Sequence, residues 1–188
     1  TIERLMGHLE KEVEKIVMNG REQGWHKVSR VRNLALYSLM LDTGVRVSEA
    51  VNIRLVDVNL DNWSVFIRAG KGHKQREVAI GRKVRADLRL WLNYRASTPI
   101  PADSPGREHL FLSNRYGWVP MSTANAQDLL EKTCLKLGIV PHLTPHTLRH
   151  AYCAYAFEQG RDPEMVRLQM GHELLATTFR YAMKIDTR

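Results

Sequence analysis

The clearest local signal in this chain is the stretch Thr144-Pro145-His146-Thr147-Leu148-Arg149-His150. Threonine is a favourable N-cap and proline a favourable first helical residue, so the stretch predicts a helix that begins here. His146 and Arg149 are three residues apart and therefore share one face of the first turns. The N–H groups and the positive dipole end of the helix lie beside them, which favours binding of an anion.

Two other interpretations of this stretch are open. His142, His146 and His150 recur every four residues, a spacing that suits metal ligands. Pro145 argues against one continuous helix through His142, and no glutamate follows His146 as in the HExxH zinc motif. In the second interpretation, His146 only caps the helix and Arg149 is a solvated charge.

The rest of the chain predicts a mainly helical domain with a small antiparallel β-sheet, an α+β fold. Spaced apolar residues predict helices over residues 3–18, 28–41, 83–94, 123–137, 164–170 and 177–183. Residues 63–68 and 76–80 are β-prone and are joined through Gly70-Lys71-Gly72, which predicts a hairpin with Lys71 at its turn. Residues 109–113 suggest a further short extended piece, and the proline-rich residues 97–107 suggest a surface loop.

Composition narrows the classes of protein. The chain has 188 residues, enough for one sizeable domain, and 28 Lys and Arg against 20 Asp and Glu give a net charge of +8. A basic surface suits nucleic acid or an anionic membrane. No apolar stretch is long enough to span a bilayer, and two cysteines provide no disulfide framework. We expect Cys134 and Cys153 to be small core residues of a cytoplasmic protein.

Six side chains form a chemically coherent set: Arg46, Lys71, His146, Arg149, His172 and Tyr181. They supply two guanidiniums, an ammonium, two imidazoles and a phenol, without a carboxylate. Guanidinium forks and imidazole donors stabilise the charge that develops on a phosphodiester during transfer. A hydroxyl nucleophile and a proton donor for the leaving oxygen would complete a transesterification site without a metal ion. Each residue alone is ambiguous.

The six residues lie within five sequence motifs that follow one another along the chain. The motifs are Thr43-Gly44-Val45-Arg46-Val47-Ser48-Glu49, Gly70-Lys71-Gly72-His73-Lys74-Gln75-Arg76, His146-Thr147-Leu148-Arg149-His150, Gly171-His172-Glu173 and Thr178-Phe179-Arg180-Tyr181. In them the chain resembles the catalytic domain of tyrosine recombinases, the phage integrase family, over nearly its whole length from Val28 onward.

The resemblance implies a role for each of the six residues. Arg46 and Arg149 would clamp the phosphate, and His172 would donate a hydrogen bond to a non-bridging oxygen. Lys71, not Lys74, would be the hairpin lysine that protonates the leaving oxygen. Tyr181 would be the nucleophile. His146 would assist proton movement.

The implied reaction has two steps and uses neither ATP, a metal nor another cofactor. Tyr181 attacks the scissile phosphate, forms a 3′-phosphotyrosyl link and expels a 5′-hydroxyl; a 5′-hydroxyl from a partner strand then reverses the step. The expected partners are double-stranded DNA with a specific recombination site and further copies of the chain, a dimer to a tetramer on DNA. We therefore expect a nucleoid-associated site-specific recombinase of the kind that integrates or resolves mobile elements.

The resemblance also bears on domain organisation. We expect residues 1–188 to form a single catalytic domain, the C-terminal fragment of a longer recombinase, because no stretch matches the N-terminal helical DNA-binding domain of the family. Two alternatives stay open: a type IB topoisomerase-like enzyme, which uses nearly the same chemistry, and a non-catalytic DNA-binding module with the same basic face.

Overall fold

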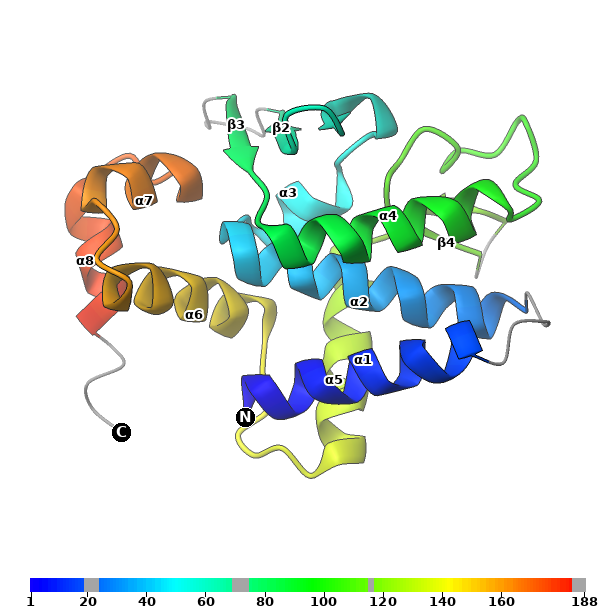
Figure 1. The fold of residues 1–188 in the computed structure, drawn as a ribbon, viewed down its shortest axis with the longest axis horizontal. Helices are drawn as coiled ribbons and strands as arrows, with labels where there is room; N and C mark the ends of the chain where they lie inside the picture. Colours follow the sequence, from blue (N-terminus) through cyan, green and yellow to red (C-terminus); the bar gives the residue numbers. More distant parts are fainter. Residues whose placement is uncertain (19–23, 69–74, 115–116, 184–188) are drawn as a thin grey trace.

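The computed structural model is mainly helical (Figure 1), and its described residues form two small antiparallel sheets. The structure describes residues 1–18, 24–68, 75–114 and 117–183, with side chains up to residue 180. Lys71 lies outside the described residues, and of Tyr181 only the backbone is described. No helix within these ranges is long and apolar enough to cross a membrane.

Three long helices form the body of the molecule: α1 (Ile2–Met18), α2 (Trp25–Thr43) and α4 (Arg82–Ala96). Helix α2 lies at the centre and packs against α1, α4 and α6 (Pro145–Glu158), so its side chains are buried on nearly every face. Helix α1 buries only one stripe, Leu5, Leu9, Val13 and Ile16, at helical spacing. Helix α5 (Thr123–Leu137) crosses behind them (Figure 1) and contacts α1 and α3 (Val47–Val51).

A three-stranded antiparallel sheet covers one edge of the body. Its strands β1 (Val58–Asn59), β2 (Ser64–Ile67) and β3 (Arg76–Ala79) follow chain order, with Val65 opposite Val78. The predicted pairing of the last two strands is confirmed. A 3₁₀ turn, Leu55–Asp57, leads into β1.

The predicted small antiparallel sheet is present, and the described residues contain a second one in addition. Strand β4 (Leu112–Ser113) pairs with β5 (Val119–Pro120) in a second, two-stranded sheet. Strand β4 lies within the short extended piece predicted over residues 109–113. Strands β1 and β5, of two residues each, were missed because they are too short to show the alternation of apolar and polar residues that identifies a strand in a sequence.

The three C-terminal helices form a lobe to one side of the body (Figure 1). They are α6, α7 (Pro163–Met170) and α8 (Leu175–Met183). A separate apolar cluster, with Cys153, Val166 and Met170 among its members, joins α6 to α7, and α8 contacts both of these helices. Cys134 and Cys153 are both buried free thiols, as expected of core residues.

Most helix ends lie at or near the residues that local sequence signals predicted. Helix α6 begins at Pro145, and the Thr144 hydroxyl accepts a hydrogen bond from the Thr147 N–H at 3.1 Å. Gly44 and Gly171 end α2 and α7 in the left-handed conformation, with φ of 64° and 68°. Helix α8 begins at Leu175, two residues before the predicted start.

Candidate active site

Arg46 stands in a tight turn between two helices. Gly44 closes α2 with a positive φ, and its α-carbon lies so close to the Tyr152 ring that a side chain there would collide with it. Arg46 is then the N-cap residue of α3 in an extended conformation. Its backbone N–H donates to Glu49 Oε2 at 2.8 Å, so the carboxylate three residues ahead fixes the turn that presents the guanidinium.

The Glu49 carboxylate also binds two guanidiniums. Arg46 Nη1 donates to Oε1 at 3.1 Å, while Arg76 donates through Nη1 at 3.0 Å and through Nη2 at 2.8 Å. Only 7% of the Glu49 side chain is exposed. Burial alone would raise the pKa of Glu49, but the hydrogen bonds and charges of Arg76 and Arg46 outweigh it and lower the pKa below its ordinary value. Glu49 is therefore an anion that orients Arg46.

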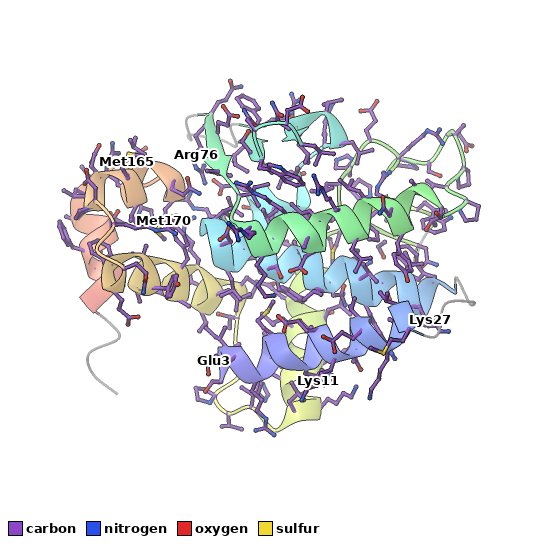
Figure 2. The ribbon with its side chains drawn as sticks, in the orientation of Figure 1. Glu3, Lys11, Lys27, Arg76, Met165 and Met170 are labelled. Atoms are coloured by element: carbon purple, nitrogen blue, oxygen red, sulfur yellow. The ribbon has the colours of Figure 1, made fainter. Side chains whose placement is uncertain are left out.

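Arg76 connects this cluster to the C-terminal lobe. It begins strand β3, and its Nε donates to the Gln169 carbonyl in α7 at 2.9 Å. Its guanidinium lies against Gly171, where a β-carbon would stand 2.6 Å from Nη1. Strand β3, which carries Arg76, contacts α7, which ends at Met170; both residues are labelled in Figure 2. One side chain thus joins α3, the sheet and the turn that carries His172.

Arg149 also connects the turn that carries Arg46 with the turn that carries His172. It is 2% exposed. One arm, Nη1, donates to the Gly44 carbonyl, and Nη2 donates to the Met170 carbonyl at 2.8 Å. These carbonyls belong to residues two positions before Arg46 and two positions before His172. The interpretation of Arg149 as a solvated charge is therefore wrong, because the fold encloses this guanidinium between the two turns.

His172 lies in the turn after α7 and is 5% exposed. Its Nδ1 is 3.0 Å from the Thr178 hydroxyl, and its carbonyl accepts a hydrogen bond from Arg167 Nη1 at 2.7 Å. Burial, followed by the charges of Arg149, Arg46 and Arg76, lowers the pKa of His172 to about 3. The ring is therefore neutral at physiological pH.

The structure brings together Arg46, Arg149 and His172 of the six predicted residues. His146 lies exposed in the first turn of α6, one turn before Arg149, with its ring 4.5 Å from that of His150 in an edge-to-face arrangement. Position 181 is in α8, six positions after the helix start. The expected hairpin turn with Lys71 falls outside the described part of the chain.

Sequence reasoning assigned no role to Glu49 and Arg76. Both lie inside the motifs that carried the resemblance, but their partners are far away in the chain. Glu49 did carry one local signal, since a glutamate three residues after an N-cap position is the second half of a capping box. Arg76 had no local signal, because its three contacts are made by tertiary packing.

The arrangement is suited to binding a phosphate diester. The Glu49 carboxylate holds the Arg46 guanidinium, and two backbone carbonyls hold the Arg149 guanidinium. The neutral imidazole of His172 lies in one of the two turns that Arg149 connects. Across the described ranges, no group of three or more His, Cys, Asp and Glu side chains is arranged to hold a metal ion. The guanidiniums of Arg46 and Arg149 supply positive charge that suits an anionic ligand.

Comparison with known proteins agrees with this chemistry. The model of the phage integrase family matches residues 7–188, and the chain belongs to that family. It is 38% identical over 152 residues to tyrosine recombinase XerD of Corynebacterium glutamicum, which covers 80% of this chain and 48% of the relative. It is 31% identical over 150 residues to tyrosine recombinase XerC of Oceanobacillus iheyensis, with the same two coverages. The chain thus spans about half the length of the curated relatives it matches.

Solved structures show the same fold. The crystal structure of XerA recombinase superposes with a TM-score of 0.73 at 30% identity, over 92% of this chain and 57% of that one. XerH site-specific recombinase, bound to palindromic difH substrate in a post-cleavage complex, gives a TM-score of 0.68 at 26% identity, over 95% of this chain and 48% of that one. The predicted family and fold class are therefore confirmed.

Proposed function

We propose that this chain is the catalytic part of a site-specific DNA recombinase that breaks and rejoins strands through a covalent bond to Tyr181. The observation that carries the proposal is that hydrogen bonds hold the side chains of both Arg149 and Arg46 in place. The Arg149 fork binds the turns before Arg46 and before His172, and Glu49 orients Arg46. Three of the expected phosphate ligands thus occupy one site in a chain of the phage integrase family.

In the proposed first step, the Tyr181 phenol oxygen attacks the scissile phosphorus. The bond from phosphorus to the tyrosyl oxygen forms and the bond from phosphorus to the 5′-oxygen breaks, which leaves a 3′-phosphotyrosyl link. Arg46 and Arg149 stabilise the charge on the non-bridging oxygens, and such preorganised donors are worth about 10²–10³-fold each in rate. His172 donates a further hydrogen bond to the same oxygens.

Two protons move in this step. The leaving 5′-oxygen takes one from Lys71, a general-acid role worth about 10²–10⁴-fold in rate. The phenol of Tyr181 loses the other, and His146, one helical turn from Arg149, assists its departure. In the second step a 5′-hydroxyl of a partner strand attacks the phosphotyrosyl link and releases Tyr181. The link conserves the energy of the phosphodiester bond, so no ATP is used.

The proposal extends to partners. The substrate is double-stranded DNA, and copies of the chain assemble on it as a dimer to a tetramer, which would place the protein with the nucleoid. The XerH structure, described as a post-cleavage complex with difH substrate, supports DNA as the substrate class. The matched family and relatives do not favour the type IB topoisomerase alternative.

A suicide duplex tests the function. The duplex carries the recombination site adjoining the gene and a nick that lets the 5′-hydroxyl fragment diffuse away, so the covalent adduct accumulates. We expect wild type to form an adduct that survives denaturation, in EDTA as well as in its absence. Tyr181→Phe should bind the duplex with unchanged affinity and form no adduct. Binding without any adduct in wild type would support the non-catalytic DNA-binding module instead.

A further inference from the structure

The contact between His172 and Thr178 joins the phosphate site to the helix that carries Tyr181. His172 Nδ1 and Thr178 Oγ1 are 3.0 Å apart, and the two residues are 5% and 0% exposed. Thr178 is on α8, three positions before Tyr181. A buried hydrogen bond therefore connects His172, the proposed hydrogen-bond donor to the phosphate, with the helix that carries the nucleophile.

The Thr178 hydroxyl can serve as donor or acceptor in this contact. Among the described residues it has no second hydrogen-bond partner. If it accepted from Nδ1–H, its own proton would be buried without an acceptor, which is unfavourable because the buried donor would lose its hydrogen bonds to water without replacement. If it donates to Nδ1, no buried donor is left unsatisfied. The geometry therefore favours the direction Thr178 O–H to Nδ1.

This direction fixes where the proton of the imidazole lies. His172 is neutral because burial and the neighbouring arginines disfavour the imidazolium. A neutral imidazole carries one N–H, and a ring whose Nδ1 accepts a hydrogen bond carries it on Nε2. Nε2–H is a hydrogen-bond donor without a positive charge, which is the property that His172 needs to bind a phosphate oxygen beside two arginines.

We propose that Thr178 is a positioning residue that holds His172 in its Nε2–H tautomer. The role in catalysis rests on the function proposed above, whereas the tautomer itself does not. The Thr178 carbonyl accepts a hydrogen bond from the buried Cys153 thiol at 3.4 Å, so this turn of α8 is fixed to α6. Thr178 and Tyr181 are both on α8. The packing of this helix therefore orients the His172 ring and positions the nucleophile together.

The test compares two substitutions of Thr178 with one of its neighbour. Thr178→Val keeps the shape and removes the hydroxyl, and Thr178→Ser keeps the hydroxyl. Thr177→Val is the matched control, because Thr177 is the preceding residue of the same helix and its side chain has no hydrogen bond among the described residues. The tautomer is measured by ¹⁵N NMR of the ring nitrogens in the whole chain, with His172 assigned from the spectrum of His172→Asn.

We expect Nε2–H in wild type, Thr178→Ser and Thr177→Val, and a mixture of both tautomers in Thr178→Val. On the suicide duplex, single-turnover cleavage by Thr178→Val should slow by about 10- to 100-fold, the range for partners that fix a histidine at metal sites. Affinity for DNA should not change, and Thr178→Ser should restore most of the rate. Thr177→Val should cleave like wild type.

Two results would overturn the inference. The Nδ1–H tautomer in wild type would show that Thr178 accepts rather than donates, and it requires no variant. A pure Nε2–H tautomer in folded Thr178→Val would show that the hydroxyl does not set it. A wild-type chain that cleaves no duplex would contradict the proposed function, while the NMR result would still decide the role of Thr178 at His172.

Discussion

Glu49 and Arg76 form a two-pronged ion pair between α3 and strand β3, with Oε1 to Nη1 at 3.0 Å and Oε2 to Nη2 at 2.8 Å. Their side chains are 7% and 11% exposed, so little water screens the pair. The same carboxylate binds Arg46, and the same guanidinium binds the Gln169 carbonyl. This pair therefore links the arginine at the phosphate site to both the sheet and the C-terminal lobe.

Replacing Glu49 by glutamine should destabilise the protein. The substitution leaves Arg76 with no buried counter-charge, and breaking one side of a buried pair costs about 3–5 kcal/mol. Urea denaturation at neutral pH measures the loss. Glu14→Gln, at an exposed position of α1, is the control and should change the free energy of unfolding by less than about 0.5 kcal/mol.

The pH dependence gives a second measurement on the same variant. Because the folded-state pKa of Glu49 is lowered, its stabilising contribution is complete above the ordinary glutamate pKa and is lost as the pH falls through the folded-state pKa. The difference between wild type and Glu49→Gln should therefore shrink on acidification. A difference that stays constant down to pH 2 would show that the pair is not ionic.

Gly171→Ala should affect both stability and cleavage. Position 171 has a φ of 68°, which alone costs a residue with a side chain about 1 kcal/mol, and a β-carbon there would press against the Arg76 guanidinium. Gly138→Ala is the matched control. Gly138 ends α5 with a φ of 58°, but nothing lies within 4 Å of its added β-carbon.

We expect Gly138→Ala to lose about 1 kcal/mol and to cleave normally. Gly171→Ala should lose more and should also cleave slowly, because the adjacent His172 and the Arg76 contacts must shift. Thermal melts and single-turnover cleavage measure the two effects. Equal behaviour of the two variants would mean that the contact with Arg76 does not constrain the turn.

Sequence reasoning succeeded where a feature depends on local chemistry. Thr144 and Pro145 start α6, and Gly171 ends α7, because capping involves residues within one turn of each other. It failed for contacts such as the one between Glu49 and Arg76, which are 27 positions apart and meet only through packing. The burial of Arg149 was missed for the same reason, since its carbonyl partners belong to two distant turns.

The pKa of His172 predicts how stability depends on pH. The ordinary histidine pKa is 6.5, and burial with the nearby arginines lowers it to about 3 in the folded state. Between these values the unfolded chain binds a proton that the folded chain does not, so the contribution is complete above pH 6.5 and is lost on acidification. At about 1.4 kcal/mol per pH unit, the loss from pH 6.5 to 5 is at most about 2 kcal/mol.

Urea denaturation of wild type and His172→Phe at several pH values measures this contribution. Wild type should lose stability relative to the variant as the pH falls from 7 to 5. NMR of the His172 ring over the same range should show no protonation. A titration of His172 near pH 6.5 would contradict the neutral imidazole at the proposed phosphate site.

The last prediction separates proton donation by Lys71 from phosphate binding by Arg46. If Lys71 protonates the leaving 5′-oxygen, Lys71→Ala should cleave ordinary DNA poorly, because an alkoxide is a poor leaving group. Sulfur in place of that bridging oxygen should restore much of the rate, since a thiolate leaves without a proton. Arg46→Ala should be rescued far less, because it has lost a contact to the non-bridging oxygens. Single-turnover cleavage of the two duplexes by the two variants measures the difference. Equal rescue of both variants, or no rescue of Lys71→Ala, would leave Lys71 as a contact to DNA and not the acid.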